Sequence, residues 1–203
     1  MIIKQLINTE ISKMSSVIRY SWTKVHSSEN LAEHSYYVIM LSDAIAEDII
    51  FKNPDITLDR YSILKYAMYH DVEEIFTWDI ITPVKYKSKS LRDELEKIGT
   101  LLLNEWLSEN FKNNIHIKNN IIKYFNEYED FKYKKLENQI VKFADQLEAF
   151  SYSISELRMW NTNFYDIAVS IISWIKKNWS SNKYFTDYII ELDNFFYEEF
   201  RKK

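Results

Sequence analysis

The chain has very few of the residues that sheet proteins and phosphate-binding loops require. Its 203 residues include one glycine, Gly99, and two prolines, Pro54 and Pro83, whereas average usage would give roughly 14 glycines and roughly 10 prolines. Tight hairpin turns need residues that tolerate positive φ, and glycine-rich phosphate loops need several glycines. The scarcity of glycine therefore predicts an all-α fold. It also excludes a P-loop and a dinucleotide-binding fingerprint.

Cysteine is absent, and so is any long apolar run. Without cysteine, disulfides, thiolate zinc sites and cysteine nucleophiles are all excluded. No run approaches the roughly 20 apolar residues that span a bilayer, and the N-terminal stretch MIIKQLINTEISKM has no signal-peptide pattern. We therefore expect a cytoplasmic protein with no membrane partner. The formal net charge of −4 argues against a broad surface for nucleic-acid polymers.

Apolar residues recur at helical spacing along most of the chain. The length and the 46% apolar content suit a single domain, residues 1–203. Helices are expected over about residues 2–17, 30–52, 58–76, 89–111, 113–128, 134–160, 163–179 and 182–201. The stretch TWDIITPVKYKSKS, which contains Pro83, is expected to be a loop. The prediction is one compact bundle of seven to eight helices.

Four polar side chains fall on helix faces that the periodicity predicts to be buried. They are His34, His70, Asp71 and Asp145, and they come from three different helices. An aspartate in a core is costly unless it is paired or bound to a metal, and a single buried histidine is more often a hydrogen-bonded core residue. Two of each form a mixed nitrogen and oxygen set that suits Mn, Fe, Co, Ni or Mg, with Zn also possible. Ordinary ion pairs are the alternative to a metal site.

Two more carboxylates follow the His-Asp pair. Glu74 is expected one helical turn after His70 and Asp71, where it can hold or deprotonate a metal-bound water. Asp79, in the following loop, is a candidate general acid for a leaving oxygen. Spacing alone leaves it equally open that both carboxylates are simply solvated. Glu73 is expected to be an ordinary charge.

Three strings of the sequence resemble the HD-domain phosphohydrolases. They are ENLAEHS around His34, YHDVEEIFTWDIITPVKY from Tyr69 to Tyr86, and VKFADQLEAF around Asp145. Together they are most similar to the bacterial HD-domain 5′-deoxynucleotidases, and the resemblance covers about residues 15 to 155. It implies the HD-domain fold and a metal-dependent phosphoric monoester hydrolase. Such an enzyme removes the 5′-phosphate from deoxynucleoside monophosphates.

The resemblance also implies roles for individual residues. A single divalent ion (Co, Mn, Mg or Zn) is expected on His34, His70, Asp71 and Asp145. Arg19 is expected to orient the substrate phosphate, because its planar fork binds two phosphate oxygens at once, and Glu74 and Asp79 are expected to be catalytic. Substrate contacts are implied for Arg19, Tyr20, His34, Asp71, Asp79, Ile80, Ile81, Thr82 and Asp145. A homodimer is implied as well.

Two aromatic residues depart from the family pattern. Tyr20 stands where the family typically has a tryptophan that packs on the sugar and disfavours a 2′-hydroxyl, and the tyrosine hydroxyl could instead accommodate a ribose. Trp78 replaces a small residue before Asp79, so its indole is expected to narrow the base or sugar pocket. Two alternatives stay open. One is an HD-type enzyme for nucleoside di- or triphosphates or modified nucleotides, and the other is a non-catalytic helical binding protein.

Other residues are candidates for supporting roles. Glu29 and Glu33 are candidates for the carboxylates that orient metal-bound histidines, and surface ion pairs are an equal alternative for them. Lys85 either assists a phosphate or lies on the rim of the site. The many tyrosines and phenylalanines after residue 120 are expected in the core and in a dimer interface rather than in a base-stacking platform.

Overall fold

The computed structural model describes residues 10–80, 82–85 and 87–200 of the chain. Within these ranges the all-α prediction is confirmed, because no strand forms beyond an isolated bridge between Ile18 and Asn30. The elements are the 3₁₀-helix η1 (Glu10–Ser16) and the α-helices α2 (Leu31–Lys52), α3 (Arg60–Tyr69), α4 (Glu74–Thr77), α5 (Thr82–Lys85), α6 (Lys89–Asn110), α7 (Ile115–Phe131), α8 (Leu136–Arg158), α9 (Phe164–Trp179) and α10 (Thr186–Phe200). In the described part of the chain, none of the helices has the length and apolar character that crossing a bilayer requires.

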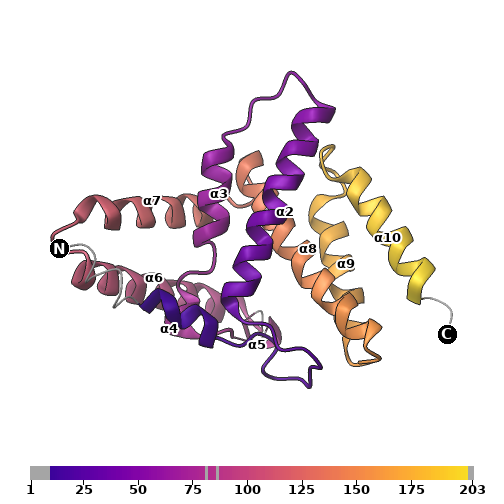
Figure 1. Cartoon of the computed structure of the whole chain (residues 1–203), viewed down its shortest axis with the longest axis horizontal. Helices are drawn as coiled ribbons and strands as arrows, with labels where there is room; N and C mark the ends of the chain where they lie inside the picture. The colour runs from indigo at the N-terminus through magenta and orange to yellow at the C-terminus, as the bar shows by residue number, and fades with distance from the viewer. Residues whose placement is uncertain (1–9, 81, 86, 201–203) are drawn as a thin grey trace.

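Helix α2 is the central element of the bundle (Figure 1). It packs against α3 and α8, while α9 covers α8 and α10 packs on α9. The short helices η1 and α4 lie with α6 and α7 on the other side of α2. This arrangement creates two hydrophobic clusters, one that includes Val38 and Ala67 and another that includes Leu31 and Val72. The seam between the clusters crosses α2 between Leu31 and Val38.

A capping box fixes the start of α2. The Asn30 side-chain oxygen accepts hydrogen bonds from the backbone N–H groups of Ala32 and Glu33, both at 3.1 Å. The Glu33 carboxylate in return accepts from the Asn30 N–H at 3.1 Å. Such a reciprocal pair satisfies N–H groups that have no partner within the helix. Glu33 is therefore a helix cap rather than the carboxylate behind a histidine, which was one of the two alternatives for it.

The helix expected over residues 58–76 is interrupted. Helix α3 ends at Tyr69, and turns closed by hydrogen bonds between residues three apart link it to α4. The N–H of Val72 donates to the Tyr69 carbonyl, and the N–H of Glu74 donates to the Asp71 carbonyl. The His70 ring contributes to the break, since its Nδ1–H donates at 2.8 Å to the carbonyl of Ala67. In a continuing helix that carbonyl would accept the N–H of Asp71. The periodicity missed this break because both flanking segments are helical and apolar.

Other boundaries differ less. Helix α10 begins at Thr186 rather than near 182, because the Asn182 side chain accepts from the N–H of Tyr184 and holds a turn there. The described part of the first expected helix, from Glu10 on, is a 3₁₀-helix. A short helix, α5, occupies Thr82–Lys85 within the expected loop, whereas Ile81 lies outside the described residues.

Candidate active site

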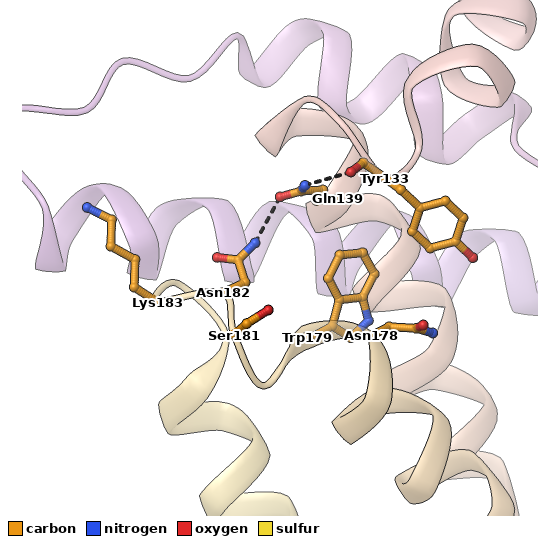
Figure 2. A pocket seen from close by; sticks show the side chains of 7 residues that line it. All are labelled: Tyr133, Gln139, Asn178, Trp179, Ser181, Asn182 and Lys183. Carbon is orange, nitrogen blue, oxygen red and sulfur yellow. Dashed lines mark hydrogen bonds between the residues drawn. The ribbon is translucent and has the colours of Figure 1, made fainter.

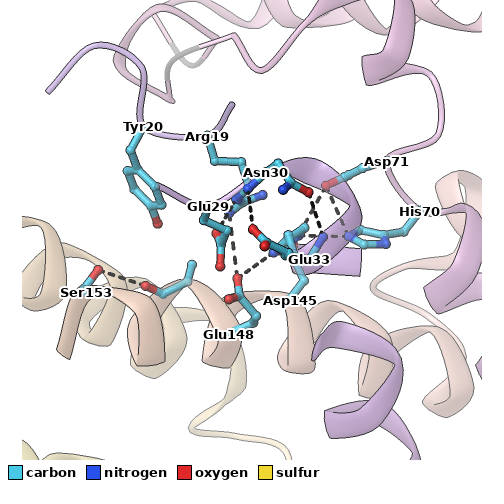
Figure 3. Close-up of polar contacts among 12 residues, drawn as sticks. Arg19, Tyr20, Glu29, Asn30, Glu33, His70, Asp71, Asp145, Glu148 and Ser153 are labelled. Carbon is cyan, nitrogen blue, oxygen red and sulfur yellow. Dashed lines mark hydrogen bonds and ion pairs between the residues drawn. The ribbon is translucent and has the colours of Figure 1, made fainter. Parts of the chain in front are cut away.

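The four polar side chains predicted to face the core meet in one place, and we call them the four-residue cluster (His34, His70, Asp71 and Asp145). Their facing atoms all lie within 4.8 Å of one another. The two histidine Nε2 atoms are 3.2 Å apart, and the Asp71 Oδ2 atom lies 3.1 Å from His70 Nε2. The Asp145 Oδ1 atom lies 3.4 Å from His34 Nε2. Figure 3 shows His70 and Asp71, from the turn after α3, converging on this point with Asp145 from α8.

Hydrogen bonds on the outer sides of the rings decide which nitrogens face the cluster. His34 Nδ1 lies 2.5 Å from Glu148 Oε2, and His70 Nδ1 lies 2.8 Å from the Ala67 carbonyl oxygen. Each Nδ1 therefore carries the proton, since both partners can only accept. Both Nε2 atoms are left with lone pairs that face two carboxylate oxygens. Four acceptors with no donor among them need a cation, so this donor set suits a divalent metal.

The electrostatics of the cluster also favour positive charge. Burial raises the pKa of Asp71, but His70 and His34 outweigh it and hold that pKa well below its ordinary value. Burial likewise raises the pKa of Asp145, but the charge of Lys142 and the hydrogen bond with His34 outweigh burial and hold that pKa well below its ordinary value. Burial and the charge of Arg19 lower the pKa of His34, but its carboxylate partners raise it well above the ordinary value. A proton and a metal ion therefore compete for the same place.

Arg19 lies beside the cluster in a buried polar network. Its Nε donates to Glu29 Oε2 at 2.9 Å, and its terminal nitrogen lies 3.9 Å from Glu148 Oε2. Burial and the charge of Glu148 raise the pKa of Glu29 to about 8. The pKa of Glu148 is lowered instead, because the contacts with His34 and the charge of Arg19 outweigh its burial. The negative charge therefore lies on Glu148 at neutral pH.

Glu74 is buried rather than solvated, and one carboxylate oxygen of the half-buried Glu73 is buried as well. Glu74 is 6% exposed; its Oε1 accepts from Lys85 Nζ at 3.2 Å, whereas its Oε2 has no hydrogen-bond partner among the described residues. Burial and the charge of Asp71 raise the pKa of Glu74 to about 7. Glu73 Oε2 is also buried without a partner in the described part of the chain, so the expectation of an ordinary charge there is wrong. Its side chain packs against Gly99, where a Cβ would lie 2.8 Å from Glu73 Cγ.

Asp79 and Tyr20 are joined across the opening of the site. The Tyr20 N–H donates to Asp79 Oδ2 at 3.3 Å, and Tyr20 has a φ of 54°. Its ring stacks on Tyr152 with centroids 4.8 Å apart and meets the edge of Phe164. These contacts hold the ring of Tyr20 in place and leave it at the cavity wall.

A cavity of about 570 Å³ opens from the four-residue cluster. Asp71, Asp145, Arg19, Glu74, Asp79 and Lys85 line its charged end, and Ile80 also lines it. Ile167, Ile171 and Trp174 from α9, together with Trp22, form an apolar wall. Trp78 is 60% exposed and does not line the cavity, so the expectation that its indole narrows the pocket is wrong.

A second depression lies at the turn between α9 and α10, away from this chemistry. Its lining residues are Tyr133, Gln139, Asn178, Trp179, Ser181, Asn182 and Lys183 (Figure 2). The amides of Gln139 and Asn182 already donate to Tyr133 and Gln139, respectively. With no carboxylate or histidine in its lining, this depression is a poor candidate for a catalytic site.

Sequence reasoning missed two parts of the site. The first is Glu148, whose signal was its place three residues after Asp145, on the same side of α8. The second is the α9 wall, where Trp174 lines the cavity. No motif marks that wall, since α9 follows the last of the three family-like strings.

Known proteins resemble this chain in sequence and fold. The YfbR-like 5′-deoxynucleotidase family is matched over residues 8–192. A 5′-deoxynucleotidase of Vibrio cholerae is 36% identical over 90 residues, 43% of this chain and 45% of that protein. A 5′-deoxynucleotidase of Vibrio parahaemolyticus is 34% identical over 100 residues, 48% of this chain and 50% of that protein. The chain thus matches about half the length of these relatives.

Solved structures share the fold over nearly the whole chain. An HD-domain phosphohydrolase from Listeria innocua superposes with a TM-score of 0.70 at 23% identity, covering 93% of this chain and 88% of its own. A cyanophage S-2L HD phosphohydrolase, solved with dA and one catalytic Zn²⁺ ion, gives a TM-score of 0.63 at 19% identity and covers 96% of each chain. The HD-domain fold expected from the resemblance is confirmed.

Proposed function

The chain belongs to the YfbR-like 5′-deoxynucleotidase family, and on that premise we propose that it hydrolyses deoxynucleoside 5′-monophosphates to nucleoside and phosphate. One observation carries the proposal. Two histidines and two aspartates converge within 4.8 Å at one end of a cavity that also presents Arg19, Glu74 and Asp79. This is the combination of groups that metal-assisted phosphate ester hydrolysis requires.

The four-residue cluster would hold one divalent ion, either Co, Mn, Mg or Zn. When bound, such an ion supplies an acidified water and polarises a phosphoryl oxygen. The zinc ion in the cyanophage relative supports a divalent metal here. The nitrogen and oxygen donors by themselves allow all four metals.

The protein's own groups have separate tasks in the proposed reaction. Arg19 binds phosphate oxygens with the part of its guanidinium that Glu29 does not occupy. As water adds to phosphorus and the bond to the 5′-oxygen breaks, the unpartnered Oε2 of Glu74 takes the water's proton. Asp79 gives a proton to the departing 5′-oxygen. Glu74 itself is shielded from bulk water, which raises its pKa to about 7 and suits it to act as a base near neutral pH.

The form of the cavity suits a mononucleotide. Arg19, Lys85 and a divalent ion on the four-residue cluster would together match a phosphate at the charged end. The apolar wall on α9 matches a planar base, with Trp174 and Trp22 as stacking surfaces. Tyr20 also lines the cavity, and its contacts with Tyr152 and Phe164 fix the position of a ring that a sugar could pack against. We therefore assign the deoxyribose preference to this aromatic group. Of the other substrate contacts implied by the family, Ile80 lines the cavity and Thr82 opens α5.

A panel of substrates tests the proposal. Metal-stripped protein is supplied with Mn, Co, Mg or Zn and with deoxy- and ribonucleoside mono-, di- and triphosphates, and released phosphate is measured. We expect release from deoxynucleoside monophosphates. Release of di- or triphosphate from the longer substrates would establish the alternative HD-type activity. No release with any metal would leave a non-catalytic binding protein.

We also propose a homodimer, as the family resemblance implies, and a cytoplasmic location, as the sequence composition predicts. Light scattering coupled to size-exclusion chromatography measures the assembly directly. A mass near twice 24.6 kDa supports the dimer, and a mass near 24.6 kDa rejects it.

A further inference from the structure

Glu148 makes two buried contacts that join the metal and phosphate parts of the site. It is 3% exposed and lies three residues after Asp145 on α8. Its Oε2 atom lies 2.5 Å from His34 Nδ1 and 3.9 Å from the Arg19 guanidinium. Figure 3 shows Glu148 reaching up from its helix toward Arg19 and Glu29. One carboxylate oxygen therefore faces both a proposed metal ligand and the proposed phosphate-binding group.

The contact with His34 acts on the metal ligand from behind. Glu148 lies on the Nδ1 side of the ring, whereas the cluster faces Nε2, so Glu148 is not itself a ligand of the same ion. By accepting the Nδ1 proton it fixes the tautomer in which Nε2 can bind a metal. His70 offers an internal comparison, because its Nδ1 donates to the neutral carbonyl of Ala67 instead. Only His34 has a charged acceptor behind its ring, which increases the basicity of Nε2.

The contact with Arg19 acts on the phosphate side. Glu29 binds the Arg19 Nε and Glu148 faces a terminal nitrogen, so two buried carboxyl groups hold the guanidinium before substrate arrives. A group that is already ordered does not have to be immobilised during binding. The guanidinium would otherwise be free to turn toward the carboxylates of the cavity.

We propose that Glu148 is a positioning residue that sets the basicity of His34 and the orientation of Arg19 through one shared carboxylate. The proposal rests on the proposed function for the role of Arg19, whereas the role toward His34 requires only that the cluster binds a metal. If Glu148 were only structural, its substitution would lower the stability of the fold, and metal affinity and KM would change together.

Three variants test the inference. Glu148→Ala removes both contacts. Glu148→Gln keeps an oxygen for His34 Nδ1–H but loses the negative charge that faces both His34 and Arg19. Glu156→Gln is the matched control, because Glu156 is fully buried on the same helix and its carboxylate binds the N–H groups of His26 and Ser27 instead. Stripped protein is titrated with Co²⁺ or Zn²⁺ alone by calorimetry. KM and kcat for a deoxynucleoside monophosphate and the melting temperature are measured in parallel.

We expect Glu148→Ala to weaken metal binding by about 10- to 100-fold and to raise KM. Glu148→Gln should recover only part of the metal affinity, because it keeps the tautomer of His34 but not the charge behind the ring, while KM stays as raised as in Glu148→Ala. A structural role does not produce this split. Glu156→Gln should lower the melting temperature and keep the metal affinity. Wild-type metal affinity in Glu148→Ala, or an equal loss in Glu156→Gln, overturns the inference. If Glu148→Ala does not fold, the KM values of Glu148→Gln and Glu156→Gln are compared instead. A raised KM in Glu148→Gln alone supports the inference, and equal KM values overturn it.

These readouts separate the inference from the proposed function. The metal titration contains no nucleotide, so the role of Glu148 toward His34 is decided even if no nucleotide is hydrolysed. Conversely, suppose that the wild-type protein releases phosphate while the Glu148 variants keep wild-type metal affinity and KM. That result would support the proposed function and reject the positioning role.

Discussion

The four-residue cluster takes its members from two different kinds of backbone. His34 and Asp145 project from α2 and α8, which have 22 and 23 residues and pack along each other. His70 and Asp71 occupy a turn where α3 has just ended and the four-residue α4 has not begun. The first pair is fixed by helical geometry, whereas the second pair depends on what surrounds the turn.

The difference shows how each half of the site is held. A long helix positions a side chain through its periodicity and its caps, and burial of its apolar face stabilises it. The turn has few backbone hydrogen bonds of its own, so it depends on the His70 contact with Ala67 and on the packing of Glu73 against Gly99 of α6. Changes to the turn should therefore affect activity through neighbours that the chemistry never touches.

The largest expected effect compares the two aspartates. We expect Asp71→Asn in the turn and Asp145→Asn on the helix each to weaken metal binding by at least about 100-fold, since loss of a ligand exceeds the cost of losing its supporting group. Phosphate release should fall to background in both. Metal titration of stripped protein measures the effect. Retention of metal by Asp71→Asn alone would exclude the turn from the site.

The next effect concerns Arg19, which lies in the irregular segment before α2. Lysine keeps the positive charge beside Glu148 but cannot bind Glu29 and a phosphate with one planar fork. We expect Arg19→Lys to lower kcat/KM by about 10- to 100-fold, as loss of a charged hydrogen bond costs roughly 1.5–3 kcal/mol. Metal affinity should stay within a few-fold of wild type. A loss of metal binding equal to that of Asp71→Asn would contradict the phosphate role.

A third prediction addresses the regular wall of the site on α9. Stacking of a base on an aromatic side chain is worth roughly 1–3 kcal/mol, so Trp174→Ala should raise KM for deoxynucleoside monophosphates by about 5-fold or more. Turnover of deoxyribose 5-phosphate, which has no base, should not change. Trp78→Ala, at an exposed position outside the cavity, is the matched control and should leave both substrates unaffected. Equal effects of Trp174→Ala on the two substrates would show that the base does not stack on this wall.

Gly99→Ala tests the support of the turn. Alanine is favoured over glycine in a helix by roughly 1 kcal/mol, but its Cβ would lie 2.8 Å from Glu73 Cγ, and overpacking costs roughly 1–3 kcal/mol. We expect a net destabilisation of about 1 kcal/mol together with reduced kcat. Denaturant unfolding measures it. In a Glu73→Ala background, Gly99→Ala should leave the free energy of unfolding unchanged or raise it. If Gly99→Ala destabilises that background as much as wild type, the contact with Glu73 is not the cause of the destabilisation.

The smallest effect is the pH dependence of the contact that ties residues 26 and 27 to α8. Hydrogen bonds from His26, Asn161 and Ser27 outweigh the burial of Glu156 and lower its pKa below the ordinary value of 4.5. A lowered pKa contributes stability that is present above pH 4.5 and is lost as the pH falls through the folded-state pKa. The melting temperature of wild type should therefore approach that of Glu156→Gln between about pH 5 and pH 3. A constant difference over this range would show that the charge of Glu156 does not contribute.

Much of the helical framework followed from local patterns. The periodicity located α2 almost to the residue, and the apolar runs located α6, α8 and α9 closely. The same periodicity ran α3 through residue 76, because apolar spacing continues across the turn and no proline or glycine marks the break. Side-chain capture of the Ala67 carbonyl is a contact that spacing does not reveal.

The sequence alone determined which side chains are in conflict with an apolar core, since burying His34, His70, Asp71 or Asp145 is unfavourable without a partner whatever the fold. It also excluded thiolate and glycine-loop chemistry through the absence of cysteine and the scarcity of glycine. The tertiary structure decided which groups lie behind and opposite that cluster. Glu148 lies behind His34 although the two are 114 positions apart in the chain. Gly99 lies 26 positions from Glu73, which it contacts, and Trp174 lines the same cavity as Glu74, about 100 positions away. Only packing between helices brings such distant residues together.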